Sequence, residues 1–107
     1  MLSAIPGISV MDDIPGSNGT WPYFLVLMPT QQSRDNALSH LWQAGLGVGR
    51  LFIHALPDYP YLASSFGNVT TPNARDFAAR TLTITNSPWL EDHDFKRICT
   101  TLEDQAA

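Results

Sequence analysis

The sequence predicts a small α/β fold, a two-layer sandwich in which helices pack on a sheet of few strands. Two observations lead to this prediction. Short runs of branched and aromatic residues alternate with stretches whose apolar residues recur at helical spacing, in the order β-α-β-loop-α-β-α. The chain has 107 residues, which is enough for one hydrophobic core and too few for a second module of similar size.

The first strand is expected just after a lead-in segment. Residues 1–20 contain three glycines and two prolines and show no sustained hydrophobic period, apart from an alternation of Ile8 and Val10 that fits an edge strand. From Trp21 to Pro29 the residues are aromatic or branched, which predicts a buried central strand. We therefore expect residues 21–107 to form the domain itself.

A helix and a second strand follow. Thr30 and Ser33 both offer a helix cap, and Gly45 offers a left-handed stop. Between them one helical face is apolar: Ala37, Leu38, Leu41 and Trp42. The run from Leu46 to His54 is again branched and aromatic, and it predicts a strand that ends at His54.

The second half of the chain begins with a long loop. Residues 54–71 contain prolines, tyrosines and a Gly-Asn pair, and an irregular stretch of this length in a small domain is a candidate for function. Thr71 and Pro72 then open a short helix that buries Ala74, Phe77 and Ala78. The alternation in residues 81–85 predicts a half-buried strand. A last helix presents one apolar face, made of Phe95, Ile98, Cys99 and Leu102.

Charge and composition exclude several classes of function. The formal net charge is −4 and the six basic residues are scattered, so no nucleic-acid footprint is expected. The longest apolar run, from Tyr23 to Pro29, is too short to cross a membrane. The histidines and the single cysteine lack metal-ligand spacing, so we expect no metal site, and Cys99 is predicted to be a core thiol. One cysteine and no secretory signal favour a reducing cytoplasm.

The residues that stand out are polar groups around the start of the long loop. These candidate binding residues are Arg50, His54, Asp58, Tyr59 and Tyr61. An imidazole, a carboxylate, a guanidinium and two phenols supply donors and acceptors that fix a hydroxylated or anionic substrate. The alternative is a loop histidine satisfied by its surroundings, with two tyrosines packed on the sheet. No nucleophile is paired with His54 and Asp58, so we assign no catalytic residue.

At this point four runs of residues resemble a known family: YFLVLMP, SRDNALSHLWQAGLGV, RLFIHALPDYPYL and TPNARDFAARTLTITNSPWLEDHDFKRICTTL. Together they resemble the carboxy-terminal small domain of the DegT/DnrJ/StrS family, over about residues 20–104. Members are fold-type I, pyridoxal-phosphate-dependent aminotransferases of nucleotide-sugar and antibiotic-sugar synthesis. The shared pattern includes a helix that ends in A-G-[LI]-G, a histidine- and proline-rich loop, a P-x-A helix start and a closing L-x-D-x-D helix.

The resemblance implies that this domain leans over an active site built mainly by a larger amino-terminal domain and lends loop side chains to the sugar substrate. His54 and one of Tyr59 or Tyr61 best match the family's loop positions. Members usually read something like Y-x-P-x-H there, whereas this chain reads FIHALPDYPYL. Which residue takes the place of the usual histidine therefore stays open.

The family's cofactor machinery is not in these runs. Its Schiff-base lysine, its aspartate beneath the pyridine ring and its phosphate-binding loop belong to the large domain, and the single lysine here, Lys96, lies in the final helical stretch. The resemblance thus implies a fragment or split half that binds no pyridoxal phosphate alone and needs a large domain or chain as its partner. We also expect self-association, through an apolar face that includes Pro57 to Phe66 and the first twenty residues. The alternative is a stand-alone α/β ligand-binding or protein-interaction module.

Overall fold

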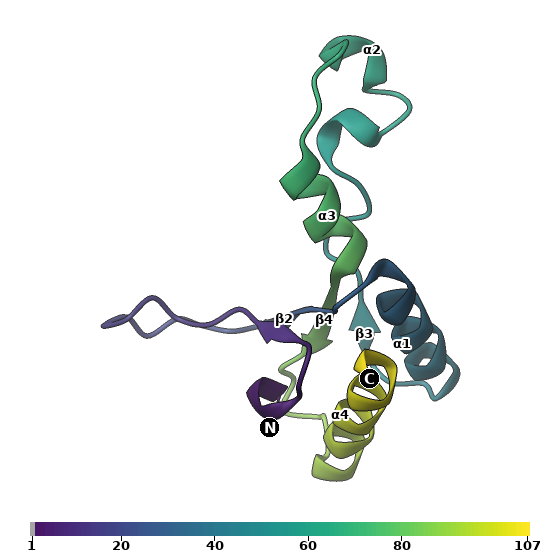
Figure 1. Ribbon diagram of the computed structural model, residues 1–107. Helices are drawn as coiled ribbons and strands as arrows, with labels where there is room; N and C mark the ends of the chain where they lie inside the picture. Colours follow the sequence, from purple (N-terminus) through teal and green to yellow (C-terminus); the bar gives the residue numbers. More distant parts are fainter. Residues whose placement is uncertain (1) are drawn as a thin grey trace.

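One antiparallel sheet of four strands, in the order β1-β2-β4-β3, organises the chain, and the computed structural model describes residues 2–107 (Figure 1). The elements are η1 (Leu2–Ala4), β1 (Ser9–Val10), β2 (Tyr23–Leu27), α1 (Gln31–Gln43), β3 (Val48–Gly49), η2 (Leu56–Asp58), α2 (Ala63–Phe66), α3 (Pro72–Arg80), β4 (Thr81–Thr85) and α4 (Asp92–Ala106), where η denotes a 3-10 helix. Within residues 2–107, every helix is too short or too polar to span a membrane.

The two central strands pair along their full length. β2 and β4 run antiparallel with Tyr23 opposite Thr85 and Leu27 opposite Thr81. β1 and β3 are short edge strands that add two residues each to the outer sides of this pair. Alternate residues of a strand point to opposite faces, so the sheet turns one apolar face toward the helices.

The core lies between that face and two helices that pack on each other, α1 and α4. The sheet contributes Val26, Met28, Leu82 and Ile84, α1 contributes Ala37, Leu38 and Leu41, and α4 contributes Ile98, Cys99 and Leu102. Leu2 and Ile5 close one end. This arrangement confirms the predicted two-layer α/β fold and, apart from Trp42 and the half-buried Phe95, the two predicted apolar helix faces.

Both predicted caps of α1 are used together. The Ser33 amide donates to Thr30 Oγ1 at 3.0 Å, and the Thr30 amide donates to Ser33 Oγ at 3.1 Å, a reciprocal capping box. Gly45 follows the helix with φ +73°, the left-handed conformation that glycine adopts without strain. Trp42 departs from the prediction, because it is 55% exposed and its indole N–H donates to the Val48 carbonyl at 2.8 Å.

The predicted strand from Leu46 to His54 is wrong except at Val48 and Gly49, the two residues that form β3. The Arg50 guanidinium donates to the Ile53 carbonyl at 3.0 Å and closes a local turn instead. The branched and aromatic side chains after Arg50 are exposed, and without a surface to pack against they do not favour a strand. His54 is therefore not a strand-end residue.

The predicted irregular loop also contains ordered structure, since η2 and α2 both lie within residues 54–71. In α3, the prediction holds for Ala78, which is buried, and in part for Phe77, which is half-buried. It is wrong for Ala74, which is exposed although it lies on the same face of α3 as Ala78, one turn nearer the amino end of the helix.

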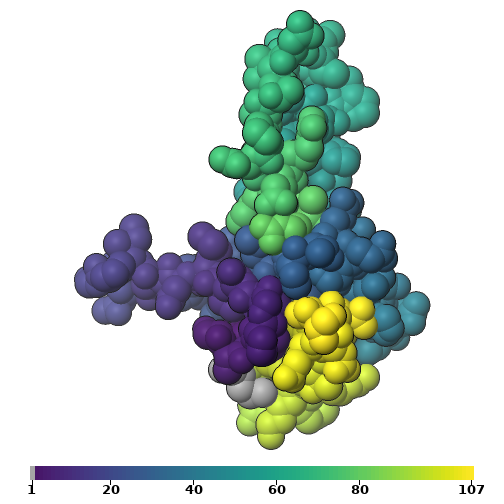
Figure 2. Space-filling model, in the orientation of Figure 1, coloured from purple at the N-terminus to yellow at the C-terminus, as the bar shows by residue number. Residues whose placement is uncertain are grey.

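Two segments project from the body (Figure 2). One is the connection between β1 and β2, drawn in purple and blue, and the other, drawn in green, runs from β3 through α2 into α3. We call the second one, residues 51–76, the arm. The Cα radius of gyration is 15.2 Å, compared with about 13 Å for a compact domain of this length. The projections account for the difference.

Two arginines attach the arm to the body. The Arg34 side chain is fully buried, and its Nη1 donates to the carbonyls of Ala78 and Thr81, at 3.0 Å each. Arg80 Nη1 donates to the Met28 carbonyl at 2.8 Å. Positive charge at the carboxyl end of α3 also complements the helix dipole. Because α3 forms one side of the arm, these contacts set where the arm begins.

Candidate functional site

A polar cleft lies at the base of the arm. It has a volume of about 270 Å³, and Arg50, His54, Asp58 and Arg75 supply its ionisable groups. The other lining residues are Gln31, Ile53, Ala55, Ala78 and Ala79. The fold therefore brings three of the predicted site residues together, and it adds Arg75 from α3, which the sequence reasoning did not select.

Arg75 forms the strongest contact in the cleft. Its Nε donates to Asp58 Oδ2 at 2.8 Å, and a second N–H donates to Asp58 Oδ1, which makes the pair bidentate. This hydrogen bonding lowers the pKa of Asp58 and raises that of Arg75. A signal for Arg75 does exist in the sequence: it is a basic residue near the amino end of a helix, where the dipole disfavours it and a carboxylate partner is needed.

Arg50 has unused hydrogen-bonding capacity. Its Nη2 is bonded to the Ile53 carbonyl, but its Nε is buried and has no hydrogen-bond partner. Buried donors are normally satisfied by protein, water or ligand. An acceptor in the cleft would complete the hydrogen bonding of this guanidinium.

His54 separates the polar cleft from an apolar pocket of about 390 Å³. The apolar side is lined by Phe52, Ala55, Leu56, Tyr59, Ala74, Phe77 and Ala78 together with His54. The His54 ring meets the Tyr59 ring edge-on, with centroids 5.2 Å apart at 78°. The Tyr61 ring lies next to that of Tyr59, with centroids 5.6 Å apart and the planes tilted by 54°, but Tyr61 is 76% exposed and lines neither hollow.

The cleft is a local excess of positive charge in an acidic chain. Two guanidinium groups face one carboxylate, whereas the formal net charge of the chain is −4. These groups offer several N–H donors to a ligand, and His54 adds a ring nitrogen at the rim. The arrangement suits binding and orienting an anionic or hydroxylated ligand whose less polar part enters the neighbouring pocket.

The remaining candidate groups lie elsewhere. Lys96 is exposed on α4 and lines neither hollow beside His54, so the chain does not place its lysine where a Schiff-base cofactor would meet this cleft. Cys99 is buried on the inner face of α4, and burial raises the pKa of its thiol, as befits a core residue. Within residues 2–107 no group of His, Cys, Asp or Glu side chains has the geometry of a metal site.

Comparison with known proteins identifies the family. The model of the DegT/DnrJ/EryC1/StrS aminotransferase family matches residues 1–103, which includes the lead-in segment as well as the domain. No curated protein matches the chain. The family match covers nearly all of the chain. The chain therefore belongs to the DegT/DnrJ/EryC1/StrS aminotransferase family.

Proposed function

We propose that this chain is the carboxy-terminal small domain of a pyridoxal-phosphate-dependent nucleotide-sugar aminotransferase, and that it lends substrate contacts and is not catalytic alone. The observation that carries the proposal is the clustering of Arg50, His54 and Arg75 in one cleft of a chain that belongs to this aminotransferase family. In the division of labour that we propose, residues 1–20 lead in from the rest of the enzyme and add β1, Leu2 and Ile5 to the body, and residues 21–107 form the rest of the small domain.

The chemistry of the cleft supports a nucleotide-sugar ligand. Such a ligand carries hydroxyl groups and a diphosphate, which need hydrogen-bond donors and positive charge. Arg75 keeps 59% of its side chain exposed while it holds Asp58, so it remains accessible to an anionic group. His54 is exposed beside it and would bind a sugar hydroxyl, with Tyr59 holding the imidazole ring from one side.

The cofactor would be held by a partner. Pyridoxal phosphate supplies the electron sink for transamination and is attached through a lysine. Lys96 is exposed on α4 and away from the cleft, so the residues of this chain do not fit that role, and we assign it to a large domain or a separate chain. A projecting arm with exposed apolar side chains suits a part that leans over such a partner. The single, buried cysteine fits the cytoplasm as the compartment.

The proposal is tested by a hybrid enzyme. Residues 1–107 replace the small domain of a characterised family aminotransferase, and steady-state kinetics are measured with its nucleotide sugar. His54→Ala should lower kcat/KM by roughly tenfold to a hundredfold, mainly through KM, because one good hydrogen bond to a strongly polar group is lost. His40→Ala is the matched control, since His40 is an exposed histidine of α1 whose Nδ1 lies 2.7 Å from the Asn36 carbonyl.

Binding to the free chain gives a second measurement. Uridine diphosphate glucose is titrated into the ¹⁵N-labelled protein, and the expected result is selective shifts of Arg50, His54 and Arg75. An active hybrid with unchanged kinetics after His54→Ala, or shifts that spare the cleft, would contradict the proposal. A stand-alone module would bind ligand without conferring activity on the hybrid.

A further inference from the structure

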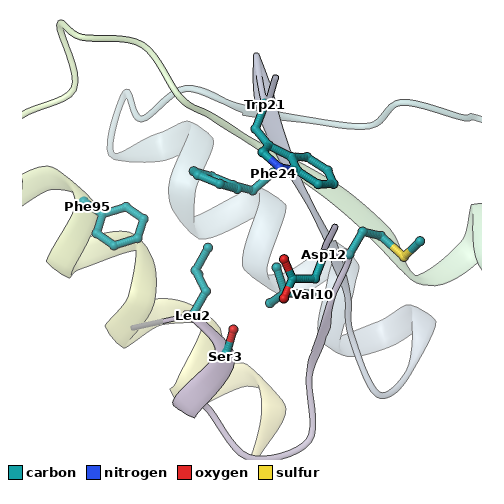
Figure 3. Close-up of a pocket in the computed structure, with 8 residues that line it drawn as sticks. Leu2, Ser3, Val10, Asp12, Trp21, Phe24 and Phe95 are labelled. Atoms are coloured by element: carbon teal, nitrogen blue, oxygen red, sulfur yellow. The ribbon is translucent and has the colours of Figure 1, made fainter. Parts of the chain in front are cut away.

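A third hollow lies at the base of the β1–β2 connection, between η1, β2 and α4 (Figure 3). It has a volume of about 330 Å³ and is lined by Leu2, Ser3, Val10, Met11, Asp12, Trp21, Phe24 and Phe95. A smaller hollow of about 220 Å³ shares Phe24 and Phe95 with it and continues along Thr85, Asn86, Ser87, Leu90 and Asp92. We call the two together the Phe24–Phe95 groove.

The groove exists because the helix layer is incomplete over one half of the sheet. α1 packs on β3, β4 and α4, whereas β1 is contacted on its helix side by the single turn η1. Phe24 is two residues from Val26 and shares its face of β2, yet Val26 is fully buried and Phe24 is only half-buried. Phe95 of α4 is half-buried as well. The core surface therefore continues into the groove without a covering element.

The charge at the groove has one sign. Asp12 lines the larger hollow and Asp92 the smaller, and neither hollow has a lysine, arginine or histidine among its lining residues. Both carboxylates are exposed. Asp12 accepts one hydrogen bond through Oδ1, from the Asp13 amide at 2.7 Å, whereas Asp13 Oδ1 accepts two, from the Trp21 indole at 3.1 Å and the Gly19 amide at 2.8 Å. A molecule that binds in the groove must therefore present apolar groups to the aromatic rings and basic groups to the exposed carboxylates of Asp12 and Asp92.

We infer that the Phe24–Phe95 groove docks a basic amphipathic helix of a partner protein, laid over β2 beside α4. A helix fits because the missing part belongs to the helix layer, where neighbouring axes lie 8–10 Å apart. A second copy of this chain fits poorly. The chain is acidic, and five of its six basic residues already make internal contacts: Arg34, Arg50, Arg75, Arg80 and Arg97. This inference does not depend on the role of the His54 cleft.

The test uses two synthetic helical peptides of fifteen residues with the same leucine stripe, one flanked by lysines and the other by glutamates. Each is titrated into the full ¹⁵N-labelled chain, with the indole N–H of Trp21 as the reporter. We expect the lysine peptide to shift Trp21 and Phe24 and to bind at least tenfold more tightly than the glutamate peptide at low salt. Raising the salt should weaken this preference, because exposed charges are screened.

Charge reversal at the rim gives the matched comparison. Asp12→Lys should weaken the lysine peptide by about fivefold or more, because the local attraction becomes repulsion. Asp104→Lys makes the same change in net charge on an exposed position of α4, nine residues beyond Phe95 and thus about 14 Å along the helix axis. Both variants are compared at 0.15 M ionic strength, where the Debye length is about 8 Å, and Asp104→Lys should leave the affinity unchanged within about twofold.

Three outcomes would overturn the inference. Equal binding of the two peptides would show that charge does not select the occupant. Equal effects of Asp12→Lys and Asp104→Lys would show only a net-charge effect. A dimer in sedimentation that Asp12→Lys disrupts would show that a second copy fills the groove. His54→Ala should leave peptide binding unchanged, which separates this test from that of the proposed function.

Discussion

Replacement of the buried Arg34 should destabilise the fold more than any exposed charge change. In Arg34→Ala the carbonyls of Ala78 and Thr81 lose their charged donor, and the missing side chain leaves a cavity between α1 and α3. A hydrogen bond from a charged donor contributes roughly 1.5–3 kcal/mol, and Arg34 donates two of them to buried carbonyls, so their loss costs about 3–6 kcal/mol. Small domains are stable by only about 5–15 kcal/mol, so little would remain.

The free energy of unfolding is measured by urea denaturation, followed by circular dichroism. Arg34→Lys should lose about 1.5–3 kcal/mol, because an ammonium group on a shorter reach keeps one of the two carbonyl contacts at best. Arg97→Ala is the control, since its guanidinium is 57% exposed and lies 3.9 Å from Asp94, and its effect should stay within about 0.5 kcal/mol. A loss below about 1 kcal/mol in Arg34→Ala would refute this account of how the arm is attached.

Three further predictions concern the free chain. Borohydride reduction after incubation with pyridoxal phosphate should give no stoichiometric mass adduct; a specific adduct on Lys96 that supports turnover would contradict the proposed division of labour. Asp58→Asn should speed proteolysis within the arm. Hydrogen bonding to Arg75 lowers the pKa of Asp58 in the folded chain from its usual value of 3.8. The pairing therefore stabilises the arm fully above pH 3.8, and this stabilisation is lost as the pH falls through the lower pKa of the folded state. The difference in proteolysis rate between the wild type and Asp58→Asn should vanish in acid. Sedimentation should show concentration-dependent association through the exposed apolar arm, weakened by Tyr61→Asp; a strictly monomeric profile at high concentration would count against it.

The elements that could be predicted from the sequence are those whose hydrophobic periodicity extends over their whole length. From Leu82 to Thr85 the burial of β4 alternates as its residues alternate in polarity, although Thr81 is buried as well. α4 buries Ile98, Cys99 and Leu102 at helical spacing. The length of β3 could not be predicted in this way. β3 is an edge strand, so it extends only as far as β4 pairs with it. After Gly49 the backbone leaves the sheet, and the Arg50 side chain donates a hydrogen bond to the Ile53 carbonyl.

The candidate site could be predicted only in part, because part of it depends on contacts between residues that are distant in the sequence. Arg50, His54 and Asp58 lie close together in sequence and could be selected, but Arg75 reaches Asp58 across 17 residues through the fold of the arm. The burial of Arg34 was not predicted, because a charged residue is normally expected at the surface. Its spacing of three, four and seven residues from the buried Ala37, Leu38 and Leu41 nevertheless places it on the inner face of α1. A charged residue at a core position of a helix is thus a signal for a buried hydrogen-bond network.

The pairing of β2 with β4 has a consequence for the order of folding. The two central strands are roughly fifty to sixty residues apart in the sequence, so their contact closes a long loop whose entropy must be lost before the sheet gains stability. α1 forms locally with its own cap, but its apolar face has no partner until β4 and α4 have been synthesised. On the ribosome, the folding barrier should therefore be crossed only after β4 has emerged, with α1 present beforehand as a fluctuating helix.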